Sequence, residues 1–430
     1  MTAVSGSAFA SRIWSRRLAV AGACVVALAV SVARGKGERI GGDFHVFWQA
    51  GCNYAAGSPL YHGDLPGARK FIYPPFAAML FRLLALFPLH IAAVILSFIS
   101  LVLFGVTIFL TRSIVARGSP ARATEVLPLV CAVVLSLHFV LDNFNRVQVN
   151  EIIFALILVG VDAHLRGKDL RAAACFVVAT AIKITPGFFF VLWLLVRGRR
   201  PAALGVPPLA LACVVAPLVV RGTATGATEL AEYYHSFLKR YQQGEVWTST
   251  RNQDVGALVY RMMRPGKHPE ELNYQYLPAS EKTAALTYEA SAALLLLLFL
   301  VMLGLLRARR AAISSFELSA VFLIGHLLSP ITERAHLVTL LFVYYTFFVL
   351  RPAALPLSAR FLLVGLWAMS AVSGLSGRDI VGRDAYYYMG GYSVIVWTML
   401  LLFVASVVLA LREATAARAA EAAPLRAAPR

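Results

Sequence analysis

The first polar segment of the chain, residues 41–75, contains a carboxylate that could act as a general base. Asp43 follows the first apolar run, so it would stand at a membrane–water boundary and could take a proton from an attacking hydroxyl group. His45, Phe47 and Trp48 lie beside it and could form a wall that faces a sugar or a lipid. Two structural roles compete with this hypothesis, because Asp is a preferred helix N-cap and aromatic residues are common at membrane interfaces.

Residues 142–151 carry seven hydrogen-bonding or charged side chains in ten positions, between two apolar runs. A turn alone needs few such residues, so we favour a binding site over a polar turn. Arg146 could neutralise a phosphate group, while Gln148 and Asn150 could orient sugar hydroxyls. Asn145 lies in the same stretch and belongs to the predicted site.

A lysine interrupts the apolar sequence further along the chain. Lys183 lies between two short apolar runs, 172–182 and 187–196, at the mouth of a predicted broken helix hairpin. A charge within a membrane is costly unless it is paired, so this lysine indicates a functional site, and a phosphate group would suit it. A lysine that snorkels to the membrane surface is an equally open alternative.

The segment 329–336 links two further apolar runs and adds three candidate binding residues. Glu333 and Arg334 could contact substrate, or they could simply pair with each other. His336 opens the next predicted helix, where it could donate a hydrogen bond to a phosphate or a sugar. A lone histidine in such a position more often has a structural role.

Composition places these residues in a membrane protein. Of the 430 residues, 59% are hydrophobic and 14% are charged, whereas soluble proteins carry roughly 25% charged residues. The chain is therefore predicted to be an all-α polytopic bundle of about ten to thirteen transmembrane helices. Apolar spacing over residues 43–56 predicts a short interfacial helix, and residues 76–87 are expected to be re-entrant or interfacial. Residues 18–33 are expected to be a retained first transmembrane helix rather than a signal peptide.

The net charge of +18 lies in short clusters of Lys and Arg between the apolar runs. This pattern is typical of cytoplasmic loops and of contact with anionic membrane lipids, and it argues against nucleic-acid binding. With these clusters inside, alternation of the spans places the distinctive polar segments on the opposite, outer face. We predict one transmembrane domain, residues 1–411, with outer loops at 34–73 and 221–285, and a disordered cytoplasmic tail at 412–430.

No motif for a cofactor occurs in the sequence. It contains no P-loop, no glycine-rich dinucleotide fingerprint and no metal-ligand spacing, and its five cysteines show no pairing pattern. We therefore expect neither a cofactor nor a metal. Because an outward-facing site has no access to sugar nucleotides, any glycosyl donor used there would be lipid-linked.

Several motifs, in family order, resemble those of the bacterial polyprenyl-phosphate-mannose-dependent mannosyltransferases of glycosyltransferase family 87. The opening string DFHVFWQA at 43–50 is followed by GSPLY at 57–61 and YPP at 73–75. The later matches are Gln148-Val-Asn150, Lys183-Ile-Thr-Pro186, Asn252-Gln253, and Ser329-Pro330 followed by His336. Together these motifs run from about residue 40 to residue 340.

The resemblance implies a GT-C fold in a bacterial inner membrane, with Asp43 as the catalytic base of an inverting transfer. The implied donor is a polyprenyl-phosphate sugar, expected to be mannose, and the acceptor a glycolipid or polysaccharide. Lys183 and His336 would contribute to a phosphate-and-sugar pocket, and Tyr73, Asn252 and Gln253 join the candidate site. A transporter or flippase for a lipid-linked sugar is the competing hypothesis. Transporters usually show paired halves with matching broken helices, and none are evident here.

Overall fold

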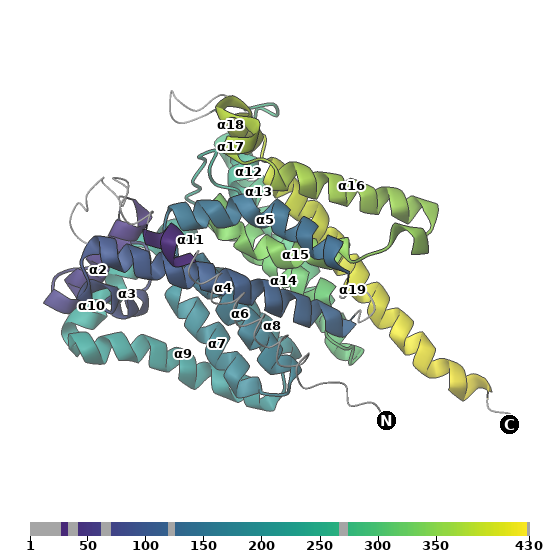
Figure 1. The fold of residues 1–430 in the computed structure, drawn as a ribbon, viewed down its shortest axis with the longest axis horizontal. Helices are drawn as coiled ribbons and strands as arrows, with labels where there is room; N and C mark the ends of the chain where they lie inside the picture. Colours follow the sequence, from purple (N-terminus) through teal and green to yellow (C-terminus); the bar gives the residue numbers. More distant parts are fainter. Residues whose placement is uncertain (1–26, 33–41, 62–69, 119–124, 266–273, 428–430) are drawn as a thin grey trace, which may run out of the picture.

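The computed structural model describes residues 27–32, 42–61, 70–118, 125–265 and 274–427, and all its regular elements are helices. No strand occurs in these ranges, so the prediction of an all-α membrane protein is confirmed. The helices form one bundle, from which the C-terminal part of α19 projects (Figure 1).

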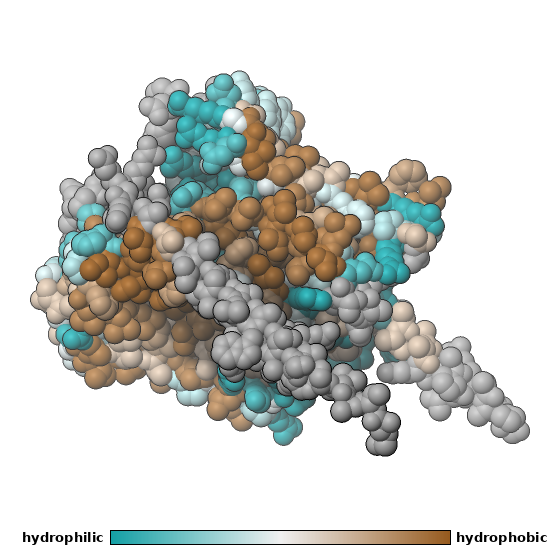
Figure 2. Space-filling view, in the orientation of Figure 1, coloured by the Kyte–Doolittle hydropathy of each residue, from teal (hydrophilic) through white to brown (hydrophobic). Residues whose placement is uncertain are grey.

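Six of the described helices are long and apolar enough to cross a membrane. They are α4 (Leu89–Gly118), α5 (Val126–Asn145), α9 (Arg200–Arg221), α13 (Glu281–Ala308), α16 (Leu357–Gly374) and α19 (Val394–Ala427). Figure 2 shows hydrophobic side chains across the middle of one face and hydrophilic ones gathered at its upper end. This banding fits a molecule that exposes its middle to lipid and its ends to water.

Shorter apolar helices pack among the long ones. They are α6 (Asn150–Leu165), α7 (Asp169–Ile182), α8 (Ile184–Arg197), α14 (Ser315–Leu327) and α15 (Leu340–Phe348). Every residue of α14 after the first is buried. The ring of its Phe322 lies 5.6 Å from Phe154 of α6, 4.6 Å from Phe190 of α8 and 5.3 Å from Phe342 of α15. A helix covered on all sides is mostly apolar, and its few polar side chains need partners inside the protein. In α14 the buried Glu317 accepts hydrogen bonds from Trp193 and Arg197, each at 2.7 Å.

The short helix predicted over residues 43–56 is present as α2 (Asp43–Ala56). It packs on α3 (Pro75–Phe81), and Gly51 permits the close approach, because a Cβ there would collide with the Phe81 carbonyl. After α3 come one turn of 3-10 helix, η1 (Leu84–Leu86), and then α4. The elements between residues 75 and 86 are too short to cross a membrane of about 30 Å, as predicted.

Short helices gather at one end of the bundle and bring the polar segments together. In Figure 1 they occupy the left and upper parts of the molecule. From the 221–285 segment come α10 (Thr223–Tyr233), the π-helical η2 (Tyr234–Leu238), α11 (Lys239–Gln242) and α12 (Val255–Met263). The other short elements at this end are η3 (Arg334–Thr339), α17 (Arg378–Val381) and α18 (Arg383–Gly391). A further short element, η4 (Pro352–Ala354), follows Arg351, which pairs with Glu125 at the opposite end of α5.

The prediction of a disordered tail at 412–430 differs from the structure, in which α19 continues as far as Ala427. The physical reason lies in the composition of this segment, since Ala, Arg and Glu are among the strongest helix formers. The predicted first transmembrane helix at 18–33 lies largely outside the described residues, of which 27–32 are helical.

Candidate active site

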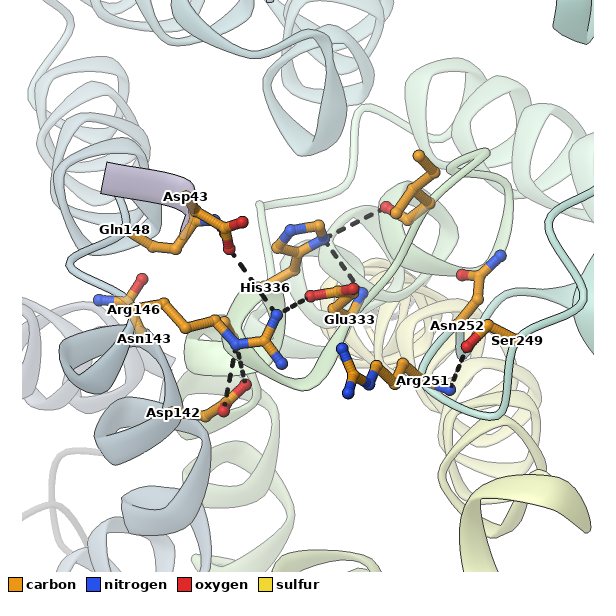
Figure 3. A network of polar contacts seen from close by, with 12 residues as sticks. Asp43, Asp142, Asn143, Arg146, Gln148, Ser249, Arg251, Asn252, Glu333 and His336 are labelled. Atoms are coloured by element: carbon orange, nitrogen blue, oxygen red, sulfur yellow. Dashed lines mark hydrogen bonds and ion pairs between the residues drawn. The ribbon is translucent and has the colours of Figure 1, made fainter. Parts of the chain in front are cut away.

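Asp43 begins helix α2 but does not cap it. The N-cap is Gly42, whose φ of 106° is readily adopted by glycine, and no side chain caps the helix. The Asp43 carboxylate instead accepts a hydrogen bond of 2.7 Å from Gln148 Nε2 and lies 3.7 Å from Arg146 Nη1 (Figure 3). The N-cap alternative for Asp43 is therefore wrong, and the carboxylate is turned toward the residues that follow α5.

Arg146 lies among three carboxylates from separate parts of the chain. Besides Asp43, it pairs with Asp142 at 3.2 Å and donates a short hydrogen bond to Glu333 (Figure 3). Burial raises the pKa of the Glu333 carboxyl, against the opposing effect of the Arg146 guanidinium. Arg334 does not pair with Glu333, because its guanidinium stacks 3.8 Å from the centre of the Tyr386 ring.

Lys183 occupies the predicted break between two helices. Its backbone is extended, with φ of −152° and ψ of 119°, and it separates α7 from α8. Its ammonium group donates to Asn150 Oδ1 at 2.8 Å and lies 5.9 Å from the centre of the Tyr73 ring. Asn150 is itself held by Asn143 and by the Ala335 carbonyl. The lysine is thus turned inward, which does not fit the snorkelling alternative.

A cavity of about 580 Å³ opens beside these groups. At one end its wall is polar and is formed by Asp43, Gln148, Lys183, Glu333 and His336. The rest of the wall is largely apolar and includes Ile72, Tyr73, Ile184, Phe188, Phe189, Phe237, Leu238, Leu328 and Ile331. Burial and the neighbouring Asp43 raise the pKa of Tyr73, so its hydroxyl stays protonated. A cavity that joins charged groups to an apolar trough suits an amphiphilic ligand.

His336 lines the cavity and also holds its own loop. Its Nδ1 lies 3.2 Å from both the Glu333 N–H, which donates to it, and the Ile331 carbonyl oxygen. This contact forms the start of η3 and positions Glu333 beside Arg146. The structural role that the sequence favoured for this histidine is therefore present.

Asn252 and Gln253 are fully buried and do not line the cavity. Asn252 Nδ2 donates to the Trp247 carbonyl at 2.9 Å, and its Oδ1 accepts from Thr332 N–H at 2.8 Å. Gln253 N–H donates to the Thr332 carbonyl at 2.7 Å. These two residues hold the 247–254 turn against the loop that carries Glu333.

Arg146, Asn150 and Arg334, whose contacts are described above, do not line the cavity, and neither do His45, Trp48 and Asn145. His45 and Trp48 contact each other on α2, and the Trp48 indole donates to the Phe87 carbonyl at 2.9 Å. Asn145 is exposed at the C-terminal end of α5. Sequence reasoning missed the aromatic wall from the 221–285 segment, namely Tyr233, Phe237, Tyr241 and Trp247. The cluster of aromatic residues between positions 233 and 241 was the available signal.

In the part of the chain that the structure describes, no group of three or more His, Cys, Asp or Glu side chains could hold a metal ion. At the polar end of the cavity, the Asp43 carboxylate lies beside the Gln148 amide and the Arg146 guanidinium. The Lys183 ammonium group faces the same end. That arrangement can accept a proton and bind an anion.

The sequence model of glycosyltransferase family 87 matches residues 71–330. A polyprenol-phosphate-mannose-dependent alpha-(1-2)-phosphatidylinositol mannoside mannosyltransferase of Mycolicibacterium smegmatis is 28% identical over 51% of this chain and 52% of that protein. A protein of the same description from Mycobacterium tuberculosis is 26% identical over 39% and 41%. The matched regions thus span about half or less of the length of these relatives.

Among solved structures, ArnT from Cupriavidus metallidurans, bound to undecaprenyl phosphate, is similar at a TM-score of 0.40 and 14% identity. The alignment covers 96% of this chain and 79% of that one.

Proposed function

Because the chain belongs to glycosyltransferase family 87, we propose that it transfers a hexose, expected to be mannose, from a polyprenyl phosphate to a glycolipid or glycan. The observation that carries the proposal is the cavity, in which Asp43 and Lys183 share one wall with an apolar trough. A polyprenyl-phosphate sugar has the same amphiphilic character. The relatives' descriptions name such a donor, which supports the same assignment.

In the proposed reaction, Lys183 binds the donor phosphate and the polyprenyl chain lies along Phe188, Phe237 and Leu238. The acceptor hydroxyl loses its proton to the Asp43 carboxylate and attacks the anomeric carbon from the face opposite the phosphate. The bond from that carbon to the phosphate oxygen breaks, and its electron pair leaves with the polyprenyl phosphate. The product therefore has an inverted anomeric configuration.

Gln148 and Arg146 orient the base in this mechanism. The Gln148 amide fixes one carboxylate oxygen of Asp43, and the Arg146 guanidinium favours its charged form before a proton arrives. A phosphate leaving group needs little help from an acid, so one carboxylate can suffice where hydrolysis of a glycoside uses two.

The proposed location is a bacterial inner membrane, with the cavity facing the periplasm. The observation behind this orientation is charge, since basic clusters at 166–171, 197–200 and 307–310 lie in the predicted cytoplasmic connections. A donor on a polyprenyl lipid would then reach the cavity from within the membrane.

The test is transfer by the purified protein. Polyprenyl-phosphate mannose, labelled in its sugar, is given together with candidate glycolipid and glycan acceptors. Labelled acceptor with inverted anomeric configuration supports the proposal. A flippase would instead move intact donor across reconstituted vesicles without cleaving it, and that result would reject transfer as the function.

A further inference from the structure

A cluster of tyrosine rings lies outside the cavity, on α18, on the residue that directly follows it and on the residues after position 273. Tyr274 is buried at its centre, with its ring centroid 5.2 Å from Tyr392 and 6.4 Å from Tyr388. The ring of Tyr276 lies 6.4 Å from Tyr392. Around the buried ring, Tyr276, Tyr388 and Tyr392 are 47%, 49% and 50% exposed. We call these three half-exposed residues the tyrosine platform.

Buried residues hold the backbone of the platform in place. The Tyr274 hydroxyl donates to the Tyr387 carbonyl at 3.0 Å, and its ring lies so close to Gly391 that a Cβ there would overlap it. The buried Arg261 guanidinium donates to the Gly391 carbonyl at 3.2 Å and to Ser393 Oγ at 2.6 Å. A ligand would therefore meet rings that are already positioned, which reduces the entropy cost of binding.

The platform is also connected to the candidate active site. Gln253 Nε2 donates to the Gly390 carbonyl at 3.2 Å, while Gln253 N–H bonds Thr332 at 2.7 Å, next to Glu333. Arg334, the residue after Glu333, stacks on Tyr386 of α18. The backbone that carries the platform is thus joined by hydrogen bonds and by ring stacking to the loop that carries Glu333.

The surroundings of the platform are hydrophilic. Arg378, Asp379, Arg383 and Asp384 on α17 and α18 are exposed. Figure 2 shows hydrophilic residues at the end of the molecule where Figure 1 places these helices. The platform hydroxyls make no hydrogen bond within the described ranges. Aromatic faces with free hydroxyls in a wet setting suit a sugar, whose C–H faces pack on rings and whose hydroxyls need partners.

We propose that the tyrosine platform binds the non-reacting sugars of an extended glycan acceptor. This inference rests on the proposed function and narrows its acceptor class to an oligosaccharide chain, beyond a single sugar on a lipid. The reacting end of the chain would reach Asp43, and sugars further along would pack on Tyr388, Tyr392 and Tyr276.

The experiment measures binding of linear manno-oligosaccharides, from disaccharide to hexasaccharide, by isothermal titration to the full-length protein in detergent without donor. In the wild type the hexasaccharide should bind at least about tenfold more tightly than the disaccharide, which corresponds to roughly 1.4 kcal/mol. The Tyr388→Ala/Tyr392→Ala double variant should lose this length dependence. Tyr388→Phe/Tyr392→Phe keeps the rings and should retain most of it. Tyr234→Ala, at an exposed tyrosine outside the platform, is the matched control.

Equal affinity for short and long oligosaccharides in the wild type would overturn the proposal. So would an unchanged length dependence in the double Ala variant with intact folding. If that variant instead lost only thermal stability in lipid, the rings would be an interfacial anchor and the proposal would again fail. Length-dependent binding without any sugar transfer would uphold the platform and defeat the proposed function, so the two failures can be told apart.

Discussion

Arg146 and Lys183, the two cations close to Asp43 and Glu333, have different surroundings and therefore different roles. Arg146 is surrounded by Asp43, Asp142 and Glu333, so its charge is already compensated within the protein. Lys183 makes no ion pair in the described part of the chain, and its hydrogen bond goes to the neutral amide of Asn150. Of these two cations, Lys183 is consequently the one that gains more from an incoming phosphate.

We predict that Lys183→Met weakens binding of polyprenyl-phosphate mannose by about tenfold or more. A hydrogen bond to a charged group contributes about 1.5–3 kcal/mol, which sets this scale. Binding of the labelled donor to protein in detergent is the measurement. Lys183→Arg keeps the charge and should recover part of the loss, whereas equal affinity in the Met variant would show that the phosphate binds elsewhere.

Asp43 and Lys183 could be proposed as site residues from the sequence because a charge beside apolar runs is conspicuous, and the structure places both on the cavity wall. It could not identify the partner of Arg146, since Glu333 lies 187 residues away and only tertiary packing joins them. For the same reason, the sequence could not show whether a polar side chain is buried and bonded within the protein or is free to contact a ligand. Asn252 and Gln253 have the residue types of a sugar site, yet their side chains are used within the protein.

At the scale of elements, the 247–254 turn supports the loop that carries Glu333. We expect Asn252→Ala to destabilise the protein by about 1–3 kcal/mol, because it leaves buried backbone groups without partners. Thermal unfolding in detergent measures this loss. Gln243→Ala, which removes an exposed amide from the same segment, should change stability little. Similar unfolding temperatures for both variants would contradict the assigned role of the turn.

Helix α12 begins with a buried carboxyl whose titration should affect stability. Asp254 caps the helix by accepting from Ala257 N–H at 2.6 Å, and burial raises its pKa to about 7. The folded protein thus binds this proton more tightly than the unfolded chain does. The stabilisation is complete below about pH 4, the ordinary range of Asp, and is lost as the pH rises through about 7.

The measurement is the unfolding temperature of the wild type and of Asp254→Asn at pH 5 and at pH 8. Asp254→Asn keeps a capping oxygen but cannot titrate, so the wild type should lose more stability across this interval than the variant. Parallel pH profiles for the two proteins would show that Asp254 is charged throughout in the folded state.

At the scale of the whole molecule, the gathering of polar segments at one end was predictable because basic clusters orient membrane helices. The distribution of basic residues does not predict which parts of the 221–285 segment are helical. Its aromatic residues complete the cavity wall, and their contribution depends on how α10 packs on α3 and α9 and continues into η2 and α11.

We predict that the cavity end and the basic end lie on opposite sides of the membrane. Single cysteines at Gln243 and Arg418, in a background without native cysteines, should react differently with a membrane-impermeant maleimide. In intact bacterial spheroplasts only Gln243→Cys should be labelled, and Arg418→Cys should react only after lysis. Labelling of both positions in intact spheroplasts, or the reverse pattern, would contradict the orientation.

In the proposed mechanism, Asp43 is the base of the sugar transfer. The most direct measurement is the single-turnover rate with bound polyprenyl-phosphate mannose, in wild type and in Asp43→Asn. Asparagine keeps the size of the side chain and can still meet Gln148, so donor affinity should stay within about twofold while the rate falls by about 10²–10⁴. An Asp43→Asn protein that binds donor and transfers sugar at the wild-type rate would contradict the claim.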